Sequence, residues 1–336
     1  MAGIRMLRKA QIGLESSAGT AVAATAIYRG LAVIDDQSKP VFPVEDVGYL
    51  SGTNRAYIPK TVVNVSMPEH EATFEQLGYV LSAGVEDVVT GTSNGGTTNG
   101  YTYLYTFPTT AAKTLKSYTI EAGDNTQAEE VEYAQVRSFN LTGAAGEAVK
   151  LSADWFGRNR TKTTFTSLSL TDVEEILFQN AKLYIDAANG TIGSTQATNT
   201  FLGFDLSVKT GVVPVWTGDG SKAFSFSKTV MPEILLKVTF EHDAVAVARK
   251  DDFAAGTERL VSIVITGSAL TGTGGTYTTK LLRINMAAKI DSIEPMGEDG
   301  DGDNTVQVTF RARFSTAPNP DLFANILVCN TLATLV

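Results

Sequence analysis

Residues 306–314 read Val306-Gln307-Val308-Thr309-Phe310-Arg311-Ala312-Arg313-Phe314. Apolar and polar side chains alternate over the whole stretch. Because successive side chains of a β-strand point to opposite faces, the pattern predicts a strand with an apolar face on a core. The polar face, which carries Arg311 and Arg313, would meet water or a neighbouring subunit. This stretch sets the expectation of a β protein.

Shorter strand-like runs recur along the chain, separated by strings of Thr, Ser, Asn and Gly. β-Branched runs between turn-forming strings are typical of mainly β proteins. Strands are predicted at residues 28–34, 41–47, 63–67, 101–107, 117–121, 137–142, 148–156, 181–185, 201–208, 233–240, 260–266, 277–286 and 306–314. One helix is predicted from Pro68 to a stop at Gly84, because Phe74, Leu77 and Val80 follow at helical spacing and proline suits the first helical position.

Two segments of the chain resemble each other, residues 58–67 and residues 231–240. Each has proline at its second position and leads into an acid-His-acid triplet, Glu69-His70-Glu71 in one and Glu241-His242-Asp243 in the other. A segment that can be helical follows each triplet, ending near Gly84 and Gly256. The order predicts a duplication, with one β domain over residues 1–172, including an N-terminal arm, and a second over residues 173–336. The alternatives are a chance echo and a single large β domain.

Composition narrows the function classes. Of the 336 residues, 43% are hydrophobic and 19% are charged, which predicts a packed core rather than disorder. The net charge is −9, and the lack of clustered Lys and Arg argues against tight nucleic-acid binding. Arg5, Arg8 and Lys9 before an alanine-rich stretch superficially mimic a signal peptide, but polar residues 15–17 interrupt it. No apolar run approaches the roughly 20 residues of a membrane helix, so no membrane partner is expected.

Three motifs with chemical potential are better explained structurally. Residues 91–95 match G-x-S-x-G, but another glycine-rich string follows where a nucleophile elbow needs a helix. His70 and His242 could form a metal site with Glu71 or Asp243, but equivalent points of a tandem repeat usually lie far apart. We therefore predict no catalytic residue, no metal site and no cofactor. The lack of a catalytic set favours a non-enzymatic role.

The acidic stretch at residues 298–304 resembles a calcium-binding loop. Counted from Asp299, positions 1, 3 and 5 are acidic, but position 6 is Asn304 rather than glycine and position 12 is Phe310 rather than glutamate. An acidic turn is the favoured interpretation, with adventitious cation binding as the alternative.

Two stretches resemble the major tail tube proteins of long-tailed, siphovirus-type bacteriophages. They are Arg8-Lys9-Ala10-Gln11-Ile12-Gly13-Leu14-Glu15-Ser16-Ser17-Ala18-Gly19-Thr20-Ala21-Val22-Ala23-Ala24 and the hairpin end Leu151-Ser152-Ala153-Asp154-Trp155-Phe156-Gly157. The strands that lead into the predicted helix at residues 68–83 are also similar. The resemblance covers residues 1–215 best and thins beyond them.

The resemblance implies two tandem β-sandwich-like tail-tube domains, each with a short flanking α-helix, whose inner sheets join into a β-barrel in the ring. It implies self-assembly into a trimeric, pseudo-hexameric ring, with rings stacked into the hollow tube that delivers DNA to the host. Its partners would be itself and other tail proteins, and DNA would pass through the lumen without specific binding. The location would be the virion, after assembly in the host cytoplasm. The alternatives are another phage structural role and a β-rich surface or adhesive module that binds carbohydrate or a receptor.

Residues 86–103 are the candidate self-assembly loop. Residues 90–103 include four glycines and few core-forming side chains, so we expect a loop that is mobile in the free subunit and orders when rings stack. Burial of Tyr101, Tyr103 and Tyr105 against a neighbour would offset the lost backbone entropy. The candidate residues are Glu86, Asp87, Asn94, Asn99, Tyr101 and Tyr103.

Overall fold

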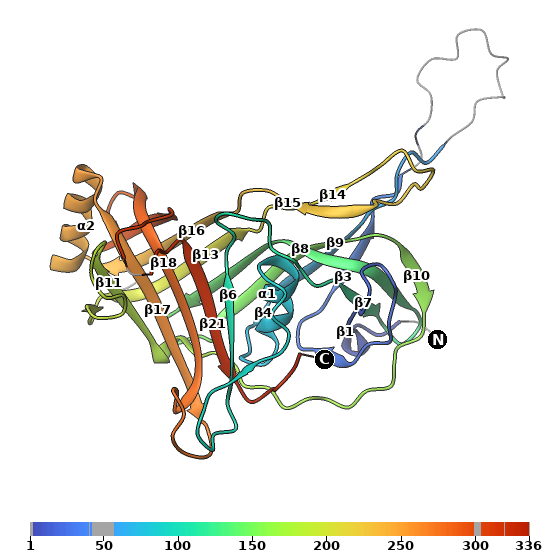
Figure 1. The fold of residues 1–336 in the computed structure, drawn as a ribbon, viewed down its shortest axis with the longest axis horizontal. Helices are drawn as coiled ribbons and strands as arrows, with labels where there is room; N and C mark the ends of the chain where they lie inside the picture. Colours follow the sequence, from blue (N-terminus) through green and yellow to red (C-terminus); the bar gives the residue numbers. More distant parts are fainter. Residues whose placement is uncertain (1–2, 40, 42–56, 299–303, 319, 336) are drawn as a thin grey trace, which may run out of the picture.

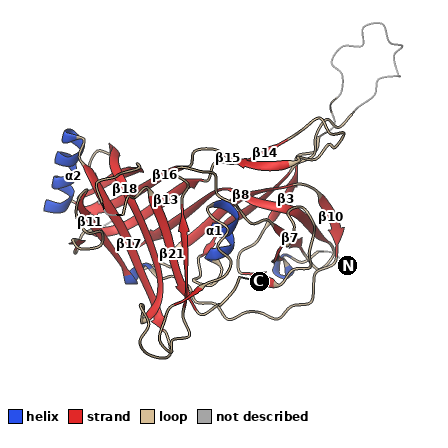
Figure 2. Ribbon diagram, viewed as in Figure 1, coloured by secondary structure: helices blue, strands red, loops and turns tan. Residues whose placement is uncertain are grey.

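The computed structural model describes residues 3–39, 41, 57–298, 304–318 and 320–335. As predicted, the protein is mainly β, with 50% strand and 8% helix, and its strands form large antiparallel sheets. Figure 1 shows β1, β7 and β10 at one end of an elongated molecule, α2, β11 and β17 at the other, and α1 between them. Figure 2 shows how far strands outweigh helices. No described helix has the length and apolar character needed to cross a membrane.

The elements fall into two series along the chain. The first is η1 (Arg5–Leu7), β1 (Lys9–Leu14), β2 (Ala26–Tyr28), β3 (Val33–Asp36), β4 (Val63–Glu71), α1 (Leu77–Gly84), β5 (Thr92–Ser93), β6 (Tyr101–Thr106), β7 (Tyr118–Gly123), β8 (Ala128–Ala144), β9 (Lys150–Gly157) and β10 (Arg160–Thr163). The second is η2 (Phe178–Asn180), β11 (Ala181–Ala187), β12 (Gln196–Ala197), β13 (Phe201–Lys209), β14 (Val212–Val215), β15 (Phe226–Thr229), β16 (Glu233–Glu241), α2 (Ala244–Ala255), β17 (Glu258–Ala269), β18 (Thr279–Ile293), β19 (Gly297–Glu298), β20 (Asn304–Ala312) and β21 (Ala324–Asn330).

Strand pairing in the first series is organised around the long strand β8. Its first part lies between β7 and β10, and β1 and β2 continue the sheet beyond β7. Its second part pairs with β9, which is followed by β4 and β3. The single strand β8 therefore takes part in two sheet segments.

The second series repeats this order around β18. The first part of β18 lies between β17 and β21, and β11 and β12 follow beyond β17. Its second part pairs with β20, which is followed by β16 and β13. A 3-10 turn precedes β1 and β11, and a helix follows β4 and β16. The pairings of the two series thus correspond strand by strand.

The two series join through one strand pair. β13 pairs with the second part of β8, from Gly203 opposite Ala144 to Lys209 opposite Ser138. The result is a continuous antiparallel run in the order β3-β4-β9-β8-β13-β16-β20-β18. No closed barrel forms among the described residues of the single chain. Because this run is continuous across the halves, the division into two domains at residue 172 stays a prediction.

The predicted helix at residues 68–84 is wrong in its first half. β4 continues through Pro68 to Glu71, with a shift of pairing register between Met67 and His70, and α1 begins only at Leu77. Proline cannot donate a ladder hydrogen bond, and a bulge is one of the places where a strand accepts it. The stop at Gly84 is confirmed.

The second predicted helical segment ends as expected. α2 begins after Asp243, whose carboxylate accepts hydrogen bonds from the backbone N–H groups of Val245 and Ala246. It ends at Gly256, which has φ of 63°, the left-handed conformation that glycine adopts without a Cβ penalty.

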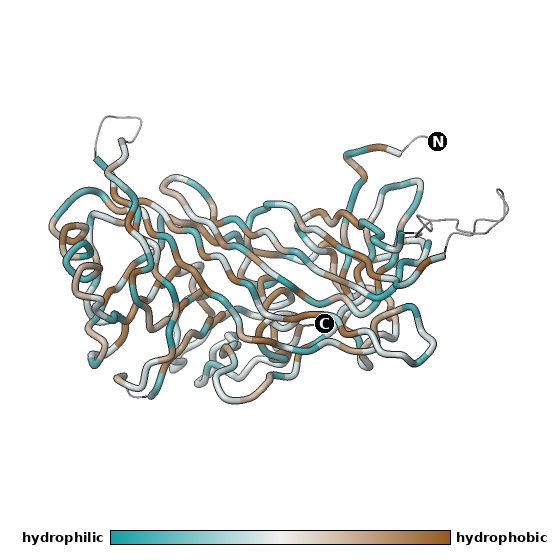
Figure 3. The backbone as a smooth tube through the Cα atoms, turned by 90° about the horizontal axis from the view of Figure 1, so that it is seen from above, coloured by the Kyte–Doolittle hydropathy of each residue, from teal (hydrophilic) through white to brown (hydrophobic). Residues whose placement is uncertain are grey.

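The strand at residues 306–314 is confirmed except at its end. Val306, Val308 and Phe310 are completely buried, but β20 stops at Ala312 and Phe314 is 51% exposed. Figure 3 shows the alternation of apolar and polar residues along many of the strands. Of the predicted strand at residues 41–47, only Val41 is within the described residues, and residues 299–303 of the acidic turn also lie outside them.

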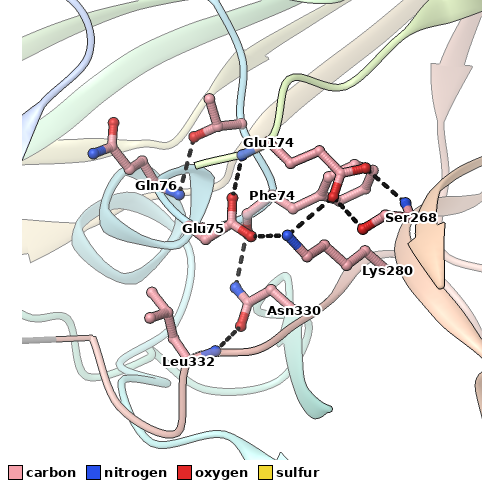
Figure 4. Close-up of polar contacts among 9 residues, drawn as sticks. Phe74, Glu75, Gln76, Glu174, Ser268, Lys280, Asn330 and Leu332 are labelled. Carbon is pink, nitrogen blue, oxygen red and sulfur yellow. Dashed lines mark hydrogen bonds and ion pairs between the residues drawn. The ribbon is translucent and has the colours of Figure 1, made fainter. Parts of the chain in front are cut away.

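A polar cluster is buried between the halves, where the chain enters α1 (Figure 4). The Lys280 ammonium on β18 lies 2.6 Å from the carboxylate of Glu75 and 3.0 Å from that of Glu174. Only 2% of the Glu75 side chain and 13% of the Lys280 side chain are exposed. The amide of Asn330 on β21 donates to the carbonyl of Phe74. These contacts fasten the start of α1 to the second half of the chain.

Candidate self-assembly surface

The pair between β8 and β13 shows what a covered strand edge looks like in this protein. Leu141 on β8 lies opposite Leu206 on β13, and Phe139 lies opposite Val208. All four side chains are at most 1% exposed. The junction therefore combines a ladder of backbone hydrogen bonds with burial of apolar side chains on one face.

The equivalent edge at one end of the run is open. β3 corresponds to β13, but among the described residues it pairs only with β4. Val33 is 52% exposed and Leu31, just before the strand, is 40% exposed. Exposed apolar side chains on an unpaired edge form a template for pairing with another chain.

The opposite end of the run is also open. Beyond Lys289, β18 pairs with β20 on one side and with no described strand on the other, and β19 likewise pairs only with β20. This part of β18 corresponds to the part of β8 that β13 covers. Met296, between β18 and β19, is 56% exposed. One chain thus carries two open edges whose counterparts meet within it.

The polar face of this run is lined by charges that neutralise one another. The ion pairs are Arg311 with Glu233 (2.6 Å) and Asp291 (2.8 Å), Lys209 with Glu233 (2.8 Å), Lys237 with Glu294 (2.7 Å) and Lys150 with Glu147 (2.9 Å). The hydrogen bonds and charges of Asp291 and Glu233 raise the pKa of Arg311 above its ordinary value. Arg311, which sequence reasoning offered to a neighbouring subunit, is occupied within the chain.

The predicted assembly loop is anchored more firmly than its sequence indicates. Asn94 is 3% exposed, and its side chain donates to the carbonyl of Tyr277 and accepts from the N–H of Tyr277. The Asn99 side chain accepts from the N–H of Thr271. The Glu86 carboxylate accepts from the N–H of Thr106. These contacts remove the reason for expecting a mobile loop, namely that the chain itself holds nothing down.

The tyrosines of this region are not available to a neighbour as expected. Tyr103 and Tyr105 are 1% and 0% exposed, because β6 pairs with β21 and turns both rings into the protein's own core. Their hydroxyls donate to the carbonyls of Leu332 and Gly78. Tyr101 is half-buried, and the backbone N–H of Asp87 donates to Thr114. The role of the loop in assembly stays a prediction, but it cannot draw on burial of these two rings.

Replacing Asn94 with alanine is expected to lower the free energy of unfolding by about 1–3 kcal/mol, because both backbone groups of Tyr277 lose buried partners. Limited proteolysis should then cut near residues 271–277, and chemical denaturation should report the loss. Asn99→Ala is the matched control, since it removes one exposed hydrogen bond and should cost well under half as much. Equal losses in the two variants would contradict the anchoring role of Asn94.

The two histidines lie in separate local networks. His70 contacts the Pro68 carbonyl at 2.8 Å through Nδ1 and the Tyr28 hydroxyl at 3.1 Å through Nε2. Burial lowers the pKa of His70 below its ordinary value. His242 accepts a hydrogen bond from Lys250 at 3.3 Å. Within the described residues, no three His, Cys, Asp or Glu side chains cluster in a way that could hold a metal ion.

No known protein family matches this chain, and no curated protein is similar enough to be its relative. The two open edges are the functional feature that sequence reasoning missed. Residues 33–36 and 290–297 do not differ in composition from strands that are covered, so only the pairing pattern of the fold distinguishes them.

Proposed function

We propose that this protein is a self-assembling structural subunit of a phage tail tube. Copies join edge to edge, with β3 of one copy beside β18 and β19 of the next. The observation that supports this is the β8–β13 junction, which already performs the same connection between the corresponding strands inside one chain. Closing the run into a ring removes both open edges, which are otherwise sites of uncontrolled pairing.

The ring would be a trimer with pseudo-hexameric symmetry. Each chain contributes two β-sandwich-like units, one per strand series, so three chains supply six. Their inner sheets join into one barrel, and stacked rings form the hollow tube. Such a subunit is not an enzyme; its partners are itself and other tail proteins, and its place is the virion after assembly in the host cytoplasm.

The charge pattern suits a channel for DNA. The cations of the polar face are held by carboxylates at 2.6–2.9 Å, and the chain has a net charge of −9. Tight binding of nucleic acid needs cations that are free to replace the counterions of phosphates. A lumen lined by this face would let DNA pass without holding it.

The test is electron microscopy of the purified chain beside an edge variant. The unmodified protein should form rings or tubes at high concentration. Leu31→Lys with Val33→Lys should stay monomeric, because two lysines on an edge oppose strand addition. Val247→Lys with Phe253→Lys is the control, since these α2 residues are 44% and 47% exposed and the change in charge is the same. If the unmodified chain remains monomeric at every concentration, or if the edge variant assembles normally, the proposal fails.

A further inference from the structure

A groove of about 600 Å³ lies beside the open edge of β3. Residues 31–34 form one wall, and the N-terminal segment contributes Arg5, Arg8 and Lys9. Arg5 and Arg8 are exposed and Lys9 is half-buried. Among the described residues, none of the three lies within ion-pair distance of a carboxylate. The groove is therefore a concentration of uncompensated positive charge in a protein that is acidic as a whole.

The two carboxylates of the groove are already occupied. Asp124 accepts from the N–H groups of Thr126 and Gln127, which lower its pKa. Glu129 lies 3.3 Å from Arg160, outside the groove. The three cations consequently remain available for an acidic partner.

The corresponding place in the second series shows what such a groove receives. η2 stands before β11 as η1 stands before β1, and there the turn between β8 and β9 docks against it. The N–H of Phe178 donates to the Glu147 carbonyl, and the N–H of Ala145 donates to the Leu202 carbonyl. A hairpin tip of the neighbouring unit thus sits beside the 3-10 turn.

The hairpin that corresponds to β8–β9 is the one formed by β18, β19 and β20. Its last described pair before the tip is Glu298 opposite Asn304. The sequence across the tip is Glu298-Asp299-Gly300-Asp301-Gly302-Asp303, with four carboxylates in six residues. In the ring, this tip of one copy would reach the η1 groove of the next.

We propose that the acidic hairpin tip at residues 298–303 of a second copy docks into the groove of Arg5, Arg8 and Lys9. This rests on the proposed edge-to-edge assembly and adds an electrostatic lock to it, which the internal junction does not use. Asp35 and Asp36 on β3 oppose the lock in part, although Asp36 lies 3.6 Å from Arg160. Because paired surface charges are screened by salt, ring formation should weaken as ionic strength rises.

The experiment is a charge reversal followed by a charge swap, read by sedimentation at low salt. Arg5→Glu with Arg8→Glu should weaken self-association at least tenfold. Adding Asp299→Arg and Asp301→Arg to the same chain should restore it. The control is Lys182→Glu with Lys222→Glu, two exposed lysines outside the groove, which changes the net charge equally and should have little effect.

The outcomes separate this inference from the proposed function. If the unmodified chain assembles and the reversed variant assembles as well, without salt dependence, the lock is wrong and edge pairing stands. If the swap fails to restore assembly lost on reversal, the acidic tip is not the occupant of the groove. If the unmodified chain never assembles, both proposals fall.

Discussion

Replacing Lys280 with methionine is expected to lower the free energy of unfolding by about 3–5 kcal/mol. The Lys280 ammonium is the only cation among the described residues that contacts both Glu75 and Glu174. Without it, the 2%-exposed Glu75 carboxylate remains buried and uncompensated. Methionine keeps much of the side-chain volume, so the loss reports charge rather than packing. Urea denaturation at neutral pH, followed by circular dichroism, measures it.

The pH range for this measurement follows from the sign of the shift. Burial alone would lower the pKa of Lys280, but hydrogen bonds and charges from Glu75 and Glu174 raise it above the ordinary value. A cation with a raised folded-state pKa stabilises the protein fully below its unfolded pKa, near 10.4, and loses that contribution as pH rises through the folded value. The pair should therefore contribute fully at pH 7.

A double variant distinguishes charge from general disruption. Lys280→Met combined with Glu75→Gln should be less destabilised than Lys280→Met alone, because no buried carboxylate then remains at position 75. The glutamine amide oxygen can still accept the hydrogen bond that Glu75 takes from the N–H of Glu174. A single-variant loss under about 1 kcal/mol would mean that water replaces the ammonium and that the cluster is not a dry contact.

The sequence predicted best the strands that have one buried and one polar face. β20 and β16 show strict alternation, and the structure buries their apolar residues. Strands covered on both faces carry no such pattern. In β1 four consecutive residues are buried, and in β21 six of seven are buried. Such a short run looks alike in a strand and in a buried helix, so both strands were missed.

Two other errors have tertiary causes. The strand β4 continues through Pro68 because β9 pairs with it on both sides of the register shift, which outweighs the local preference of proline for a helix start. The tyrosines of β6 are buried because β21, more than 200 residues further along the chain, pairs with that strand. The candidate site has the same origin. Whether β3 and the end of β18 are covered depends on all the other pairings, which no local pattern encodes.

Replacing Trp155 with alanine is expected to cost about 3–5 kcal/mol of the free energy of unfolding. Trp155 on β9 is 1% exposed, lies opposite Val65 and Val136, and meets the Tyr118 ring edge-on at 6.2 Å. Its indole nitrogen has no hydrogen-bond partner among the described residues, so apolar packing accounts for its contribution. Removing the ring leaves a cavity that the surrounding strands can fill only in part.

The strand correspondence supplies the matched control for Trp155. Val308 on β20 lies opposite Val238 as Trp155 lies opposite Val65, and it is completely buried. Val308→Ala removes far fewer atoms from the same place in the second series and should cost about 2 kcal/mol. Trp155→Phe should lose less than Trp155→Ala, because it keeps an aromatic ring and removes the unpaired N–H. Circular dichroism is the readout, since a Trp variant changes the fluorescence itself. Equal costs at positions 155 and 308 would show that cavity size does not decide stability in these two cores.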